Sequence, residues 1–158
     1  MEPISGTLLS LLNNNEHHTN KIKMSYLSLL SQLSECPLIN DDDFVKKIND
    51  IDSVDGTIFI LFFGDINEND FRIIASGTVL IEPKIIHNSS VGHIEDIVVD
   101  NAFRGHGLAK NILDRLKDYS FNQRNVYKVI LDCDEKLVQF YNKNDFKTKG
   151  VQMAKYLI

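Results

Sequence analysis

HIEDIVVDNAFRGHGLAK, residues His93–Lys110, contains three elements in order. Its first seven residues are rich in β-branched apolar side chains and predict a strand that ends at Val99. A polar loop with two glycines follows over residues 101–107. Residues 108–121 then carry apolar side chains at helical spacing, which predicts an amphipathic helix. This order is typical of sites that bind phosphate groups at a helix N-terminus.

The loop has the spacing Arg-x-x-Gly-x-Ala, formed by Arg104, Gly107 and Ala109. Glycine lets backbone N–H groups approach a ligand without a side chain in the way, and the first helical turn adds free N–H donors. The pattern therefore predicts a cradle for a diphosphate. It lacks the Gly-Lys-Ser/Thr of a P-loop and the acidic ribose ligand of a dinucleotide fold. The alternative is a glycine-rich helix start that binds nothing.

Upstream of this stretch, the chain predicts helices and then antiparallel strands. Residues 24–33 carry apolar side chains at helical spacing, and Asp41–Asp43 precede a second apolar run as acids do at a helix N-terminus. We favour a capped helix over a metal site for this acidic triplet. Thr57–Phe63, TIFILFF, predicts a buried strand, and Arg72–Glu82 predicts a strand that pairs back as a hairpin.

Downstream, residues 128–133 predict another strand, residues 136–143 a short helix, and residues 146–158 a terminal hairpin or strand. Antiparallel strands followed by a β–α–β–α–β arrangement predict an α+β fold, with a central twisted mixed sheet flanked by helices. One domain over residues 24–158 accounts for these elements. Residues 1–23, with an asparagine-rich patch, are left as a poorly defined segment, either a loop or a disordered insertion.

The composition suits one soluble globular domain: 158 residues, 43% hydrophobic and 25% charged. The net charge of −5 argues against nucleic acid as the main partner, because phosphate neutralisation needs a clustered basic surface. No apolar run approaches the roughly 20 residues that span a bilayer, and the N-terminus lacks the basic region of a secretory signal. Two cysteines without metal-binding spacing predict reduced thiols, so we expect a cytoplasmic protein without a metal site.

Four stretches carry a resemblance to a known family: KIIH at 84–87, GHIEDIVV at 92–99, VILDCDEKLVQFYNK at 129–143 and GVQM at 150–153. With the Arg-x-x-Gly-x-Ala loop they resemble the GNAT superfamily, and within it the enzymes that acetylate an amino-sugar phosphate. The resemblance implies a GNAT fold, acetyl-CoA as co-substrate without a metal, and N-acetylation of glucosamine 6-phosphate on the route to UDP-N-acetylglucosamine. It also implies an intertwined homodimer whose active sites share residues across the interface.

The same resemblance assigns three catalytic residues. Tyr141 is placed near the sulfur of coenzyme A, where its phenol donates a proton to the leaving thiolate. Asp132 is placed near the substrate amine, and Glu95 is slightly favoured over Asp96 as the carboxylate that faces the sugar. Because Glu95 and Asp96 are neighbours in a strand, they point to opposite faces and cannot form a dyad. The alternatives are a core-packing tyrosine, a cap that Asp132 and Asp134 make for the helix at 136–143, with Asp134 alone as the cap if Asp132 is catalytic, and carboxylates with only structural roles.

The implied binding residues form two sets. The acetyl-CoA set combines the strand end, the loop with the helix start, and the segment around the tyrosine: Ile97, Val98, Val99, Arg104, Gly105, His106, Gly107, Leu108, Ala109, Lys110, Tyr141, Asn142 and Lys143. The substrate set combines the KIIH loop, the strand carboxylates and a C-terminal lysine: Lys84, Ile85, Ile86, His87, Glu95, Asp96, Leu131, Asp132 and Lys155. Family members tend to carry arginine near this C-terminal position, and lysine lacks its bidentate fork.

Two other functions stay open at this point. A GNAT protein that acts on another amine, such as a peptide N-terminus or a lysine, needs neither the KIIH loop nor a phosphate-binding C-terminus. An idle acetyl-CoA sensor is expected to lack Tyr141 or to carry a broken loop, and this sequence shows neither. A covalent route through Cys133 is disfavoured, because no histidine base is placed beside it by sequence.

Overall fold

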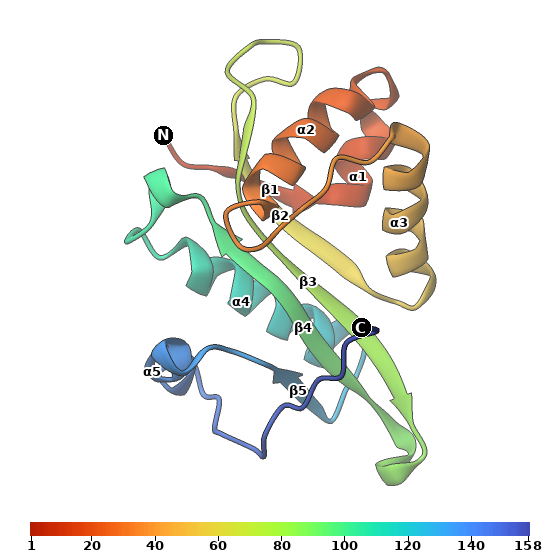
Figure 1. Ribbon diagram of the computed structural model, residues 1–158, viewed down its shortest axis with the longest axis vertical. Coiled ribbons are helices and arrows are strands. Elements are labelled where there is room, and N and C mark those ends of the chain that lie inside the picture. Colours follow the sequence, from red (N-terminus) through yellow and green to blue (C-terminus); the bar gives the residue numbers. More distant parts are fainter.

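Five strands form one sheet in the order β1–β2–β3–β4–β5 (Figure 1) in the computed structural model, which describes all 158 residues. The strands are β1 (Ile4–Thr7), β2 (Thr57–Phe63), β3 (Arg72–Lys84), β4 (Ser89–Val99) and β5 (Lys128–Leu131). The helices are α1 (Leu8–Asn14), α2 (Thr19–Leu30), α3 (Asp41–Ser53), α4 (Leu108–Asp118) and α5 (Val138–Asn142). Neighbouring strands are antiparallel except β4 and β5, which are parallel. The predicted mixed α+β sheet is confirmed.

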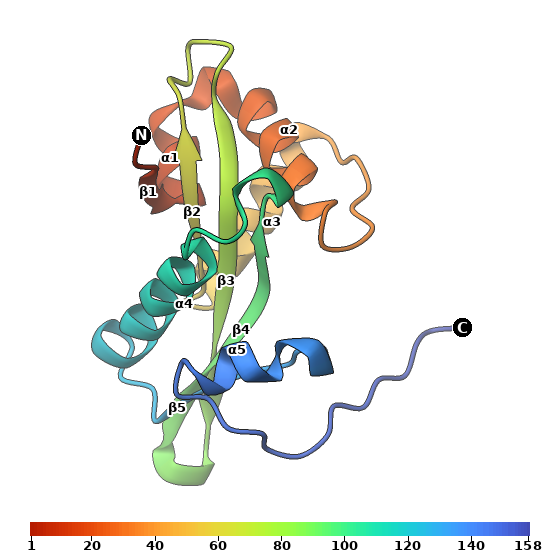
Figure 2. The same cartoon turned by 90° about the vertical axis from the view of Figure 1, so that its left-hand side faces the viewer.

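Helices cover both faces of this sheet. α4 packs against one face through Ile112, Leu113 and Leu116, which are fully buried. α1, α2 and α3 cover the other face, as Figure 1 and Figure 2 show together, with Ile22 and Leu29 of α2 buried there. Because each fully buried side chain of this size contributes about 2 kcal/mol, both layers hold the strands in place. No helix combines the length and the apolar character that crossing a bilayer requires.

The apolar run of β2 serves both cores, as a strand with helices on each face must. Ile58 and Ile60 pack with α1–α3, whereas Phe59 and Leu61 pack with α4. β2 is also paired on both of its edges, to β1 and to β3. The prediction of an inner, buried strand from TIFILFF is confirmed.

α3 begins at the acidic triplet, but its cap is Asn40. The Asn40 Oδ1 accepts a hydrogen bond from the Asp43 N–H at 2.8 Å, and Asp41–Asp43 fill the first turn, where the helix dipole favours acids. Asp41 also pairs with the buried Lys23 at 2.7 Å. The triplet therefore serves the helix, as its sequence context indicates.

The elements of the second half are present with small shifts at their ends. α4 stops at Asp118 and continues as a π-helical turn over Tyr119–Gln123. A 3-10 turn over Glu135–Leu137 leads into α5. The strand, loop and helix order of the sequence is thus confirmed through residue 143.

Residues 1–23 form regular structure, which corrects the expectation of a poorly defined segment. β1 pairs antiparallel with β2, and Thr7 then caps α1 by accepting a hydrogen bond from the Ser10 N–H. Leu8 and Leu12, one helical turn apart, are buried against the sheet. The asparagine-rich patch begins at the end of α1. Only two buried leucines mark this short helix in the sequence, so its helical spacing was not recognised.

Residues 146–158 form no strand, so the predicted terminal hairpin or strand is wrong. Beyond Phe146, which packs on Tyr141, this C-terminal tail extends away from the body (Figure 2), and its apolar side chains are exposed, with Val151 at 88% and Met153 at 91%. A hydrogen bond of 3.0 Å from Gln152 Nε2 to Asp132 Oδ2 joins it to the body. The tail has the apolar spacing of a strand but no strand of its own chain beside it.

Candidate active site

A gap opens between β4 and β5 inside the sheet. The two strands pair in parallel over four residue pairs, the last of which is Ile94↔Leu131. β5 ends there, whereas β4 runs on to Val99. Residues 95–99 therefore have no strand beside their β5-facing edge, and the backbone groups of such an edge are free to bind an extended ligand. Residues 97–99, predicted to hold the arm of the coenzyme, lie along this edge.

β4 contains a bulge where the gap begins. The pairing register of β3 and β4 shifts between Ser76 and Thr78, and Asp96 of β4 adopts a φ of 53°. Opposite the bulge, Gly77 lies so close to α4 that a Cβ would stand 2.6 Å from the Ile112 side chain. A bulge interrupts the ladder and re-aims nearby groups. The regular alternation expected for Glu95 and Asp96 is therefore broken at this point.

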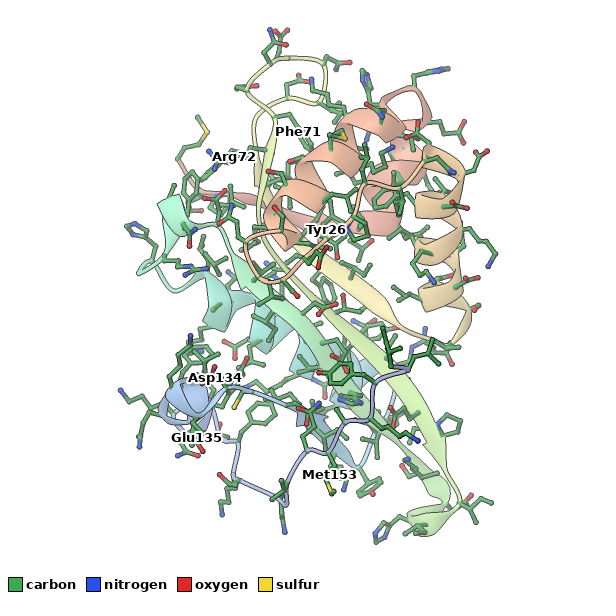
Figure 3. The ribbon with its side chains drawn as sticks, in the orientation of Figure 1. Tyr26, Phe71, Arg72, Asp134, Glu135 and Met153 are labelled. Atoms are coloured by element: carbon green, nitrogen blue, oxygen red, sulfur yellow. The ribbon has the colours of Figure 1, made fainter.

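The two neighbouring carboxylates nevertheless lie in different surroundings. Glu95 is half-buried beside His93. Asp96 is exposed, and its charge acts on Tyr26 of α2 (labelled in Figure 3) and on Cys36. Burial is the main reason that the pKa of Tyr26 rises to about 12 and that the pKa of the Cys36 thiol is raised, and the Asp96 charge adds to both. The two carboxylates form no dyad, as expected.

The loop between β4 and α4 exposes backbone N–H groups. Gly105 and Gly107 have φ of 85° and 77°, a region that other L-residues enter at a cost, and no atom lies within 4 Å of where a Cβ would stand. Gly107 is the N-cap of α4, and it offers no side chain to the first turn, which also holds no acid. The N–H groups of residues 108–110 and the positive end of the helix dipole are thus left for an anionic ligand.

The base of this loop is fixed by the buried Asp100, which pairs with the half-exposed Arg72. Asp100 accepts a hydrogen bond from the Ala102 N–H at 2.9 Å and pairs with Arg72 at 2.5 Å; Arg72 is labelled in Figure 3. Burial acts to raise the pKa of Asp100, but these two partners outweigh it and the pKa is lowered. Arg104 folds back, and its Nε donates to the Val99 carbonyl at 3.1 Å. Arg104 thereby closes the loop onto the end of β4.

Lys110 is less available than the sequence suggests. Its Nζ pairs with Asp114, one helical turn on, at 2.5 Å. Asp114 also contacts Lys117 at 3.2 Å, and the hydrogen bond from Lys110 is the main cause that lowers the Asp114 pKa. The cradle therefore offers chiefly backbone groups, with Arg104 beside them.

A second group of polar residues lies on the sheet face opposite α4. Glu82 of β3, His93 and Glu95 of β4, and Asp132 just after β5 form this group, which we call the carboxylate cluster. The His93 Nδ1 lies 3.1 Å from Glu82 Oε1, and its Nε2 lies 3.1 Å from Glu95 Oε1 and 3.7 Å from Asp132 Oδ2. Lys84 borders the cluster, 3.6 Å from Glu82. Three carboxylates thus surround one imidazole at the end of the β4–β5 pairing.

Glu95 has a perturbed acidity within this cluster. Burial is the main cause that raises its pKa above the usual glutamate value, His93 lowers it, and the charges of Asp96, Asp132 and Glu82 raise it further. A carboxylate that is poised in this way, next to an open strand edge, is a candidate for proton transfer or for binding a cation.

Asp132 and Asp134 divide two roles that the sequence left open. Asp134 is the N-cap of the turn before α5, where its Oδ1 accepts from the Lys136 N–H at 3.2 Å; Figure 3 shows Asp134 and Glu135 together on this turn. Asp132 takes no part in the cap and instead contacts His93 and Gln152. The capping alternative therefore applies to Asp134, and Asp132 is available to the cluster.

Tyr141 joins α5 to the core beneath the gap. Its ring is buried and packs against Phe140 and Phe146 with centroid separations of 5.0 and 5.8 Å. The same core contains Val99 and, at its margin, Ala109 of the cradle helix. Burial raises the pKa of the Tyr141 phenol, and the nearby Cys133 adds to the effect. Asn142 and Lys143, which follow it, are exposed.

Some predicted substrate residues are not brought to the cluster within one chain. Ile85, Ile86 and His87 form the tip of the β3–β4 hairpin, with Ile85 98% exposed, and the His87 ring packs on Tyr127 at 4.7 Å. Lys155 lies in the exposed tail. Only Lys84 of the KIIH stretch contacts the cluster, through Glu82.

His93 is the residue at the centre of the cluster, and it is not among the residues predicted from the sequence. The signal was present, because His93 and Glu95 are two residues apart in a strand and so share a face. No group of three or more His, Cys, Asp or Glu side chains is arranged to hold a metal ion.

Comparison with known proteins accounts for these features. A model of the acetyltransferase (GNAT) family matches residues 27–146. This chain belongs to the GNAT acetyltransferase family. Glucosamine 6-phosphate N-acetyltransferase 1 of Dictyostelium discoideum is 41% identical over 133 residues, which cover 84% of this chain and 82% of that protein. The GNAT fold explains the splayed strands, the bulge and the cradle as parts of one architecture.

Two solved acetyltransferase structures are similar to this chain over most of its length. The glucosamine-6-phosphate N-acetyltransferase of Arabidopsis thaliana has a TM-score of 0.78 at 34% identity, and the match covers 89% of this chain and 94% of that one. An acetyltransferase of Trypanosoma brucei has a TM-score of 0.81 at 30% identity, and the match covers 99% and 100% of the two chains.

Proposed function

We propose that this protein transfers the acetyl group of acetyl-CoA to the amine of glucosamine 6-phosphate. The observation that carries the proposal is the placement of the open β4 edge between two sites. The cradle with its free N–H groups lies at one end of that edge, and the carboxylate cluster lies at the other. Relatives that match over most of their length carry this activity in their names.

The residues present suit acetyl-CoA. Gly105 and Gly107 leave open space where side chains would otherwise block a diphosphate, and the amides of residues 108–110 bind its oxygens. The edge of residues 97–99 binds the extended arm through backbone hydrogen bonds. Asn142 and Lys143, exposed at the end of α5, add polar contacts. This binding places a reactive thioester between Tyr141 and the carboxylate cluster.

The side chains divide the proton transfers between them. Glu95 attracts the ammonium form of the amine, and Asp132 orients the amine and takes up its proton. A backbone N–H of residues 97–99 stabilises the charge that grows on the carbonyl oxygen. As the C–N bond forms and the C–S bond breaks, Tyr141 gives its proton to the departing sulfur, and the second proton lost by the nitrogen passes through solvent to restore the phenol. The coenzyme leaves as a thiol, and positioning carries much of the rate.

A homodimer completes the phosphate side of this site in our proposal. β5 is an edge strand, since it pairs only with β4, and the C-terminal tail has exposed apolar residues with strand-like spacing. The hairpin tip at Ile85 and Ile86 adds more exposed apolar surface. Such edges and patches are normally covered in the native assembly. We propose that the tail and the tip of one subunit reach the partner, bringing Lys155 and His87 to its substrate.

Thiol release from acetyl-CoA tests the substrate directly. We expect turnover with glucosamine 6-phosphate, a rate lower by at least about tenfold with unphosphorylated glucosamine, and none with a lysine peptide. The physical reason is that the phosphate is needed to draw the substrate to its cationic side chains. Turnover of the peptide alone would reject the sugar assignment. Binding of acetyl-CoA without turnover of any amine would favour a sensor.

Replacing Gly107 with alanine tests the cradle. Holding a Cβ at a φ of 77° costs roughly 1–2 kcal/mol, so the loop relaxes and its N–H groups lose their alignment. We expect the KM for acetyl-CoA to rise about tenfold, with a much smaller change in the KM for the sugar. Gly6→Ala is the matched control, because its Cβ also has open space but its φ is not positive. Equal effects of both variants would contradict the role of the loop.

A further inference from the structure

We propose that His93 is a positioning residue that ties Glu82 of β3 to Glu95 of β4 and holds Glu95 as an anion beside Asp132. The inference rests on the proposed function, because its catalytic consequence depends on Glu95 attracting a cationic amine. Its structural part, the pair of contacts made by one ring, is independent of the substrate.

The sheet register places the four side chains on one face. His93 pairs with Leu80 on β3 and with Ile130 on β5. Side chains two residues apart share a face of a strand, so Glu82, Glu95 and Asp132 all stand on the face of His93. His93 is thus the only member with a carboxylate on three sides, one from β3, one from its own strand and one from the end of β5.

Both ring nitrogens are engaged at once. Nδ1 lies 3.1 Å from Glu82 and Nε2 lies 3.1 Å from Glu95. Ionised carboxylates only accept hydrogen bonds, so making both bonds requires a proton on each nitrogen. In its doubly protonated form the ring is a cation clamped between two anions, with 23% of its side chain exposed. Contacts at both nitrogens fix the orientation of the ring. Through the Nε2 contact, the ring in turn orients the Glu95 carboxylate.

The charges around Glu95 set its pKa, and His93 is one of them. The groups that face it are His93 and Asp96 of its own strand, Glu82 of β3 and Asp132 after β5, and Lys84 pairs with Glu82 at the margin. Burial and the three carboxylates raise the pKa of Glu95, and His93 is the neighbour that lowers it. Without the imidazole, Glu95 keeps its proton to higher pH and no longer attracts an ammonium group.

The His93→Gln variant tests this role, because it keeps a polar side chain of similar length but removes the charge and one of the two contacts. We expect kcat/KM for glucosamine 6-phosphate at pH 7 to fall about tenfold and the acidic limb of the pH profile to move to higher pH. The KM for acetyl-CoA stays unchanged, since the cradle is made by another segment. His17→Gln, the same change at an exposed histidine, leaves both profiles unchanged.

A second measurement reports the clamp without turnover. Imidazole nitrogen signals of His93 are recorded by NMR in the full-length protein. Glu82→Gln is expected to move the Nδ1 signal and Glu95→Gln the Nε2 signal, while the His17 signals stay in place. Signals that ignore both substitutions overturn the clamp. A drop in activity of His93→Gln with an unshifted acidic limb overturns the electrostatic role, since a merely structural loss moves no limb.

The kinetic measurement and the NMR measurement together separate this proposal from the proposed function. If wild-type protein acetylates no amino sugar, the proposed function fails and the catalytic consequence fails with it. The nitrogen signals then still decide whether His93 joins the two strands. If the wild-type protein is active, the His93 nitrogen signals shift and the acidic limb of the His93→Gln pH profile moves to higher pH, both proposals are supported.

Discussion

The Tyr141→Phe variant is expected to bind acetyl-CoA normally while its kcat falls about 100-fold. The ring stays in place, because its contacts with Phe140 and Phe146 are aromatic and do not involve the hydroxyl. Only the proton for the departing sulfur is lost. Burial raises the pKa of Tyr141 above the usual tyrosine value, so the phenol keeps its proton throughout the neutral range. Activity that depends on it is therefore lost only as pH rises through that raised pKa.

Tyr119→Phe is the matched control for this prediction. Tyr119 is as buried as Tyr141, but its hydroxyl donates to the Asp55 carbonyl at 2.7 Å and accepts from Arg124 at 2.8 Å. Losing these bonds costs stability, about 1 kcal/mol each, and leaves kcat unchanged. Kinetics and thermal unfolding of both variants separate the two effects. A kcat for Tyr141→Phe within twofold of wild type would show that another group protonates the sulfur.

The strands and helices after residue 56 were predictable because periodicity and packing agree there. TIFILFF packs on both faces of the sheet, as its unbroken apolar run indicates. The loop from Arg104 to Ala109 was recognisable because its glycines are required by local backbone geometry. Such local constraints leave a direct mark on the sequence. The helix at Leu8–Asn14 left almost none, because two buried leucines were enough to place it.

The site itself was only partly predictable, for two physical reasons. The β4 bulge depends on a register shift against β3 and on the close approach of α4 to Gly77, and periodicity along one strand does not reveal it. The carboxylate cluster is formed by three segments that are distant in the sequence. The contact between Glu82 and His93 depends on how β3 and β4 pair, so the sequence alone does not indicate it. The tail is the opposite case. Its alternating apolar residues predict a strand, but residues 146–158 form none in this structure, because no strand of the chain lies beside them to pair with.

Met153→Asp is expected to give a folded monomer that has lost at least about 100-fold in activity on glucosamine 6-phosphate. Met153 is 91% exposed in the single subunit (labelled in Figure 3), where an acidic side chain changes stability by less than about 0.5 kcal/mol. In the proposed dimer the same position is buried at the partner, and an unpaired charge there is strongly unfavourable. The tail is displaced, and Lys155 no longer reaches the phosphate.

Val54→Asp is the control for that variant, since Val54 is an exposed apolar residue, at 50%, that lies outside the tail at the end of α3. Sedimentation velocity gives the oligomeric state, and thermal unfolding shows whether the body is intact. Because the tail makes so little contact with its own subunit, a stable monomer isolates the contribution of the partner to the site. A wild-type protein that sediments as a monomer and is fully active would show instead that one chain supplies every residue the reaction needs.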